Sequence, residues 1–133
     1  MVRLSDSIGN RVVLLFYPAA FTGVCTKEMC TLSGSMNRIE SAEAEVFGIS
    51  VDGIFANAAF ADANEINFPL LSDTNRQASR AYGVEIPFVM PDYTAAQRSV
   101  FVIDEVGKIS YAWIAENPGI EPDYEAILEH LES

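Results

Sequence analysis

The stretch Arg11-Val-Val-Leu-Leu-Phe-Tyr-Pro18-Ala-Ala-Phe-Thr-Gly-Val-Cys25 contains the local signals that decide the fold. Its β-branched and aromatic start predicts a buried strand that ends at Pro18. Residues 18–23 are typical of a loop. From Val24, apolar side chains at three- and four-residue spacings predict a helix that runs to about Ala44. The cysteine therefore lies in the first turn of a helix that follows a buried strand through a short loop.

Strand and helix signals alternate along the rest of the chain. Strands are predicted at 45–51, 68–71, 98–104 and 108–114, helices at 54–64, 74–82 and 121–131, and an irregular segment at 84–97. Asp73 is the expected N-cap of the helix that follows it. A turn at 105–107 joins the last two strands as an antiparallel hairpin. This order predicts one α/β domain over residues 1–133, with a thioredoxin-like fold and a central mixed sheet flanked by helices.

Composition and charge limit the classes of partner. Half of the residues are apolar, which is enough for a packed core, and the longest apolar run is only strand-sized. No secretory signal is visible, so a cytoplasmic location is expected. Nineteen acidic residues face eight basic ones, so neither nucleic acid nor a membrane surface is an expected partner. A solvated acidic surface explains this balance, and adaptation to high salt is the alternative.

Two cysteines, Cys25 and Cys30, are the candidate reactive groups. The first turn of a helix offers unpaired N–H groups and the positive end of the helix dipole, which favour a thiolate at Cys25. The alternative is an inert buried cysteine. Two cysteines are too few for a disulfide scaffold. A zinc site would need four ligands, and the single histidine, His130, is far along the chain, so no metal is expected.

The pattern Pro18-x-x-x-Thr22-x-x-Cys25 resembles the active-site motif of the peroxiredoxins. The resemblance extends through Phe68-Pro-Leu-Leu-Ser-Asp73, Ala81-Tyr-Gly-Val84 and Arg98-Ser-Val-Phe-Val-Ile-Asp104. It implies that Cys25 attacks the peroxide, that Thr22 and Pro18 frame it, that Arg98 stabilises the thiolate, and that Glu28 holds Arg98. A surface position is the alternative for both Arg98 and Glu28.

The same resemblance implies the reaction. The thiolate of Cys25 attacks hydrogen peroxide or an organic hydroperoxide and becomes a sulfenic acid, with no metal, flavin or haem. Thioredoxin or a similar dithiol is the expected reductant. A monomer and a homodimer both remain open. Pro18 and Phe21 are expected to shield the pocket from water, whereas His130 and Trp113 receive no functional role.

Cys30 is the candidate resolving cysteine. Its spacing from Cys25 resembles the peroxiredoxin Q (bacterioferritin-comigratory) type, and nearby residues also resemble a subgroup related to alkyl hydroperoxide reductase E. On an ideal helix, residues i and i+5 are about 140° apart around the axis and about 7.5 Å apart along it. A disulfide spans Cα atoms up to roughly 7 Å apart. A Cys25–Cys30 bond therefore requires residues 23–32 to unwind; the alternative is a one-cysteine enzyme with Cys30 in the core.

One departure and two rival functions complete the prediction. Peroxiredoxins carry an N-terminal hairpin of the Gly-x-x-Ala-Pro-x-Phe type before the position of Arg3-Leu4, and this sequence has none, so apolar surface is expected on one side of the sheet. A thiol–disulfide oxidoreductase would predict Cys-x-x-Cys, which the sequence does not match. A degenerate thioredoxin-like binding module with unreactive cysteines remains the alternative function.

Overall fold

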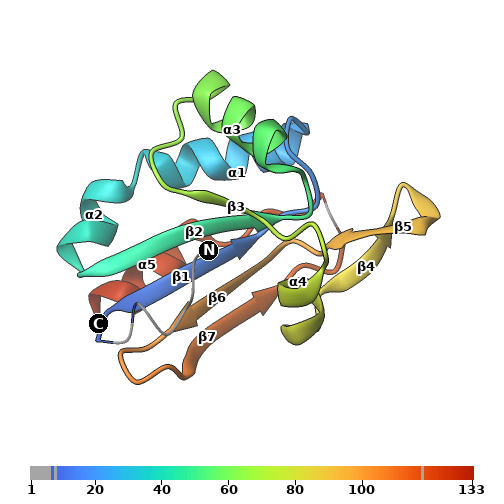
Figure 1. Cartoon of the computed structure of the whole chain (residues 1–133). Coiled ribbons are helices and arrows are strands. Elements are labelled where there is room, and N and C mark those ends of the chain that lie inside the picture. The colour runs from blue at the N-terminus through green and yellow to red at the C-terminus, as the bar shows by residue number, and fades with distance from the viewer. Residues whose placement is uncertain (1–6, 8, 118) are drawn as a thin grey trace.

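The computed structural model describes residues 7, 9–117 and 119–133 (Figure 1). Residues 2–6, whose sequence resembles the tail of the missing hairpin, lie outside these ranges. The strands are β1 (Arg11–Phe16), β2 (Ala44–Ser50), β3 (Leu70–Ser72), β4 (Glu85–Phe88), β5 (Met90–Ala96), β6 (Ser99–Ile103) and β7 (Ile109–Ile114). The helices are α1 (Gly23–Ser33), α2 (Met36–Ser41), α3 (Ile54–Ala63), α4 (Gln77–Ala81) and α5 (Tyr124–Glu132).

Five strands form one mixed sheet in the order β3-β2-β1-β6-β7. The central strand β1 runs parallel to β2 and antiparallel to β6. β3 adds in parallel to β2, and β7 adds in antiparallel to β6. The arrangement confirms the predicted mixed sheet flanked by helices, including the antiparallel hairpin at its end.

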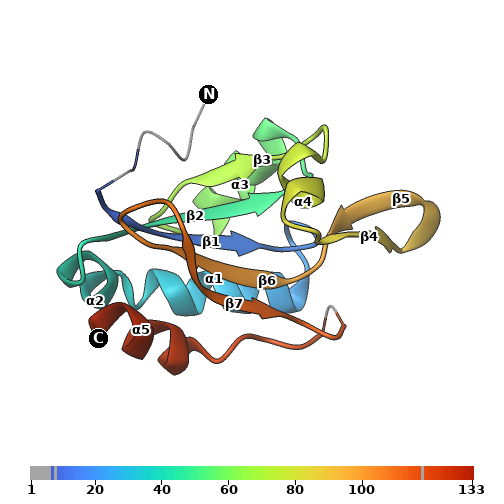
Figure 2. The same ribbon diagram turned by 90° about the horizontal axis from the view of Figure 1, so that it is seen from below.

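The sheet carries a hydrophobic cluster on each face, and alternate residues of β1 supply both of them. Val13 and Leu15 pack with residues of α1, α2, α3 and α5, while Leu14 and Phe16 pack toward α4 on the other face. Figure 2 shows α1, α2 and α5 along one side of the sheet. Because the side chains of a strand alternate between faces, a strand buried on both sides reads as an uninterrupted apolar run.

The predicted helix over 24–44 is wrong in one respect, because the chain forms two helices. α1 ends at Ser33, where Gly34 N donates to Cys30 O over 3.1 Å and Ser35 N donates to Leu32 O over 3.0 Å. Glycine and serine are weak helix formers. The break turns the chain so that α2 can bury Ile39 against the sheet.

The segment 84–97, predicted as irregular, contains the antiparallel hairpin β4–β5. Prolines at 87 and 91 argued against strands there. A two-stranded hairpin tolerates them because each of its strands has an open edge. The hairpin extends away from the main sheet beyond α4 (Figures 1 and 2).

Two helix starts also differ from prediction. α4 begins at Gln77, although Asp73 still accepts hydrogen bonds from the N–H groups of Ala78 and Ser79, as a cap would. α5 begins at Tyr124 because Asp123 caps it and accepts from Ala126 N over 3.0 Å. None of the helices in the described part of the chain is long and apolar enough to cross a membrane.

Candidate active site

Buried and half-buried polar groups at the end of β2 and the start of α3 hold the loop that follows β1. Tyr17 Oη donates to Asn57 Oδ1 over 2.7 Å. Asp52 Oδ2 accepts from Ala20 N over 2.8 Å and from Ser50 Oγ over 2.7 Å. Burial raises the pKa of Tyr17, so its hydroxyl remains a donor. These contacts hold the loop that leads into α1.

Sequence reasoning missed this support. Asp52 lies between the strand predicted at 45–51 and the helix predicted at 54–64, and Asn57 lies in that helix, so neither received a role. The available signal was their position, because polar side chains at the carboxyl end of a central strand lie at the edge where α/β folds build their sites.

Cys25 lies in the first turn of α1, as predicted. Thr22 is the N-cap residue, with extended backbone, and its side chain makes no capping hydrogen bond. The Thr22 hydroxyl donates instead to Ala19 O over 3.0 Å, while its carbonyl accepts from Thr26 N over 2.9 Å. The oxygen of the hydroxyl keeps lone pairs that can accept another hydrogen bond.

Arg98 reaches Cys25 from the segment before β6, the strand next to β1 in the sheet. The residue directly precedes β6, and its Nη2 donates to Cys25 Sγ over 3.0 Å. Its Nη1 donates to Glu28 Oε1 over 2.7 Å. All three side chains are buried, so the surface positions considered for Arg98 and Glu28 are wrong. A guanidinium in this position stabilises negative charge on the sulfur.

Burial and the Arg98 guanidinium act in opposite directions on the pKa of Glu28. Desolvation raises the pKa of Glu28 to about 7, against the opposing influence of the Arg98 guanidinium. Its second oxygen, Oε2, has no hydrogen-bond partner among the described residues. A buried carboxylate with one bare oxygen is costly, which makes the pair a feature that packing alone does not require.

An open pocket of about 310 Å³ adjoins these residues. It is lined by Pro18, Thr22, Gly23, Val24, Phe88, Arg98 and Gly119. Phe21, expected to shield this pocket, is not among the lining residues. It is 57% exposed and packs on Phe60, with ring centroids 5.2 Å apart. Phe88 from β4 lines the pocket instead, and sequence reasoning missed it because its segment was read as irregular.

Cys30 is also in α1, but its side chain is on the solvent side. Both cysteines are free thiols, Cys25 buried and Cys30 exposed. Cys30 Sγ lies 3.9 Å from Asn64 O. The alternative that Cys30 is a core cysteine is therefore wrong. With α1 intact, the two thiols lie on different sides of the helix, as the five-residue spacing predicts.

A short segment before α5 is tied to α1 between the two cysteines. Lys27 Nζ lies 3.2 Å from Glu121 Oε2, and Tyr124 Oη donates to Glu121 Oε1 over 2.6 Å. The hydrogen bond from Tyr124 lowers the pKa of Glu121, and the Lys27 ion pair does so as well. Glu121 is thus a charged link from α1 to the start of α5.

Comparison with known proteins agrees with this geometry. The model of the family described as AhpC/TSA matches residues 1–112. The chain belongs to the AhpC/TSA family. A relative within it, peroxiredoxin Bcp of Escherichia coli, is 38% identical over 84% of this chain and 73% of its own length. The chloroplastic 2-Cys peroxiredoxin BAS1 of Hordeum vulgare is 34% identical over 99% of this chain and 64% of its own length.

Solved structures in this family have the same fold. The AhpC of Enterococcus faecalis has a TM-score of 0.88 at 30% identity, covering 98% of this chain and 78% of that one. BcpB of Mycobacterium tuberculosis has a TM-score of 0.87 at 32% identity, covering 98% and 84%. The chain spans about half to two thirds of the length of the plant relatives it matches. The predicted thioredoxin-like fold of a peroxiredoxin is confirmed.

Proposed function

We propose that this chain is a thiol-dependent peroxidase that reduces hydrogen peroxide and organic hydroperoxides. The observation that carries the proposal is the contact of Arg98 Nη2 with Cys25 Sγ, at 3.0 Å in a buried site. A cysteine that only packs in the core needs no guanidinium beside its sulfur. Arginine is almost never fully buried unless its charge is paired. Residues 1–133 are taken as one domain, because both hydrophobic clusters pack on one sheet.

Each group has a role that its chemistry supports. The Cys25 thiolate attacks the terminal oxygen of ROOH, so an S–O bond forms as the O–O bond breaks. The products are Cys25–SOH and RO⁻, which takes a proton from water. Arg98 stabilises the negative charge that moves from sulfur to the leaving oxygen. Thr22 and Pro18 frame the peroxide, and Glu28 orients Arg98.

Cys30 is proposed to resolve the sulfenic acid. Its thiol attacks Cys25–SOH, a disulfide forms, and water leaves. Because the two residues are separated by five positions in α1, the helix must unwind first. A dithiol such as thioredoxin then reduces the disulfide and is itself oxidised. A reducing compartment such as the cytoplasm would keep both cysteines as thiols between turnovers.

Rapid mixing with hydrogen peroxide tests the proposal. Cys25 should be oxidised far faster than a free thiol, and Cys25→Ser should abolish this reaction. Arg98→Ala should slow it by about a hundredfold to a thousandfold. Cys30→Ser should keep the first oxidation fast and leave a sulfenic acid in place of a disulfide. Mass spectrometry of quenched samples follows each species.

The alternative function has its own result in this experiment. If wild-type Cys25 reacts at the rate of a free thiol, the peroxidase proposal fails, and the degenerate binding module becomes the better description. If oxidation is fast but no Cys25–Cys30 disulfide forms, only the resolving role of Cys30 fails.

A further inference from the structure

The chain between β7 and α5 contacts Arg98 at one end and α1 at the other. Directly after β7, Ala115 N donates to Arg98 O over 2.9 Å. Gly119 then lines the active-site pocket together with Arg98, and the chain runs to α5 on the side of the sheet that carries α1 (Figure 2). At Glu121 it reaches Lys27 on α1. This segment therefore borders the buried ion pair of the site.

Glu121 uses both of its carboxylate oxygens in this segment. Its Oε2 lies 3.2 Å from Lys27 Nζ, and its Oε1 accepts from Tyr124 Oη over 2.6 Å. The ring of Tyr124 packs on the hydrophobic cluster that contains Cys25. Since Lys27 directly precedes Glu28 on α1, these contacts fix the Glu121 carboxylate beside the ion pair.

Glu121 and Glu28 differ in charge near neutral pH. Desolvation is the main cause that raises the pKa of Glu28 to about 7, and the negative charge of Glu121 acts in the same direction. The hydrogen bond from Tyr124 is the main cause that lowers the pKa of Glu121. The positive charges of Lys27 and Arg98 lower the pKa of Glu121 as well. Glu121 therefore stays ionised at pH values where Glu28 takes up a proton.

Protonation of Glu28 weakens its hold on Arg98. Glu28 Oε1 accepts from Arg98 Nη1 over 2.7 Å, while Oε2 has no hydrogen-bond partner among the described residues. A neutral carboxyl group attracts a guanidinium less than a carboxylate does. Other titratable groups that face this pair are those of Cys25 on α1, Tyr17 after β1 and Tyr124 on α5. Desolvation raises the pKa of both tyrosines, so they stay neutral.

We propose that Glu121 is a second anionic support for Arg98, a positioning residue that keeps the guanidinium on Cys25 when Glu28 carries no charge. The inference rests on the proposed peroxidase function. Glu121 is not one of the residues that line the pocket, so it acts on peroxide reduction through Arg98. The site can then work on both sides of the pH at which Glu28 titrates.

The test follows the rate constant of Cys25 oxidation by hydrogen peroxide from about pH 8 to about pH 5.5, across the titration of Glu28. Glu121→Gln keeps the size of the side chain and removes its charge. The ratio of the wild-type rate to the Glu121→Gln rate should rise by about threefold to tenfold as the pH falls. A direct effect of Glu121 on the thiolate would act the other way, because loss of a negative charge favours the thiolate at low pH.

Glu28→Gln carries the same test to a single pH. Its neutral amide replaces the carboxyl group at every pH. In this background, Glu121→Gln should lower the rate by about threefold to tenfold already at about pH 8, and the ratio should not change with pH.

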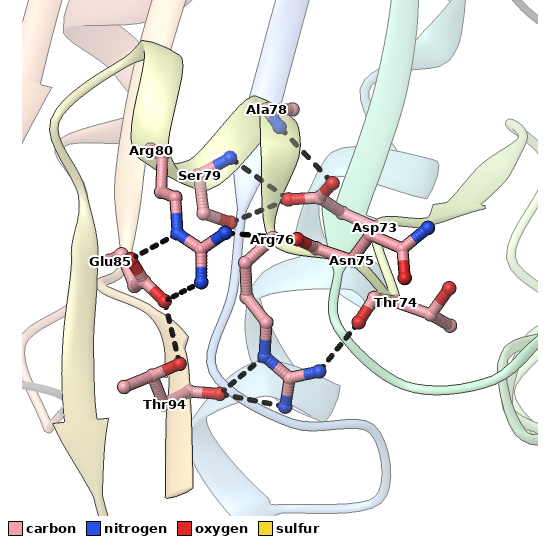
Figure 3. A network of polar contacts seen from close by, with 9 residues as sticks. All are labelled: Asp73, Thr74, Asn75, Arg76, Ala78, Ser79, Arg80, Glu85 and Thr94. Atoms are coloured by element: carbon pink, nitrogen blue, oxygen red, sulfur yellow. Dashed lines mark hydrogen bonds and ion pairs between the residues drawn. The ribbon is translucent and has the colours of Figure 1, made fainter.

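Glu85→Gln is the matched control, because Glu85 also joins a basic and a hydroxyl partner (Figure 3). It pairs with Arg80 Nε at 2.8 Å and accepts from Thr94 Oγ1 over 2.7 Å. Its side chain is 21% exposed, against 26% for Glu121. These contacts lie between α4 and the β4–β5 hairpin, so the rate ratio of this variant should stay within about twofold across the same range.

Two results would overturn the inference, and they differ from failure of the proposed function. One is a ratio for Glu121→Gln that stays level or falls as the pH falls. The other is an equal rise for Glu85→Gln. A wild-type chain that oxidises Cys25 at the rate of a free thiol at every pH instead rejects the peroxidase function, and the positioning role with it.

Discussion

Arg98 and Glu28 form an ion pair of 2.7 Å with both side chains almost completely shielded from solvent, at 2% and 0% exposure. The pair fixes the plane of the guanidinium. The second terminal nitrogen of Arg98 can then lie 3.0 Å from Cys25 Sγ. A planar fork that contacts a carboxylate with one nitrogen and a sulfur with the other is a geometry that a lysine ammonium cannot reproduce.

Arg98→Lys should therefore slow the oxidation of Cys25 although the charge is kept. We expect a loss of about tenfold to a hundredfold, because one ammonium cannot hold both partners in place. Single-turnover kinetics with hydrogen peroxide measure it, with the exposed Arg80→Lys as control. A rate within twofold of the wild type would show that charge alone is sufficient.

Glu28 should make stability depend on pH. Its pKa is raised from 4.5 to about 7, so between these values the folded chain holds more proton at Glu28 than the unfolded chain. The free energy of unfolding then falls as pH rises through this window, by on the order of 2–3 kcal/mol. Glu28→Gln removes this contribution, and its stability relative to the wild type should improve from pH 5 to pH 8.

Urea denaturation of both proteins across that pH range measures the effect. Glu40→Gln, at an exposed position, is the control and should run parallel to the wild type. Parallel curves for Glu28→Gln as well would mean that Glu28 has an ordinary pKa in the folded chain.

The link between Lys27 and Glu121 should restrain the first turns of α1. Lys27→Met breaks the 3.2 Å ion pair and should speed Cys25–Cys30 disulfide formation after peroxide treatment. Because Lys27 is 70% exposed, an increase of only about twofold to fivefold is expected. Lys108→Met removes the other lysine and is the control. Equal disulfide rates in all three proteins would exclude a restraining role.

Asp52 should hold the active-site loop in place through its contacts with Ala20 N and Ser50 Oγ. Asp52→Ala leaves Ala20 N and Ser50 Oγ without their shared acceptor. The free energy of unfolding should fall by about 1–3 kcal/mol. Cys25 oxidation should also slow, because the loop that frames it is held less firmly. Asp62→Ala, at an exposed acid on α3, is the control for the lost charge. If Asp52→Ala keeps its free energy of unfolding but oxidises Cys25 slowly, Asp52 positions the loop and does not stabilise the fold.

The strand–loop–helix unit around Cys25 could be predicted because its signals are local. The apolar run from Val12, the stop at Pro18 and the helical spacing after Val24 all agree with the structure. Position alone also placed Cys25 in the first helical turn. The break at Gly34 was missed because apolar spacing continues across it to Ile39.

The partners of Cys25 could not be derived in the same way. Arg98 is 73 residues away, and only resemblance to a family pointed to it. Glu28 is buried on the face of α1 where it pairs with Arg98, and a helix pattern in isolation reads it as a surface residue. Phe88 depends on a hairpin whose prolines argue against strands. Each of these depends on contacts between distant segments, which local propensity does not report.

The break between α1 and α2 at Gly34 would limit how far the proposed unwinding of α1 extends. α1 is eleven residues long and contains both cysteines, whereas α2, beyond Gly34, has its own core residue, Ile39. Melting of α1 can therefore stop at Ser33, as a small cooperative unit with its own opening equilibrium. If Cys30 resolves Cys25 as proposed, each turnover would unwind α1 and leave the strands and the other helices folded.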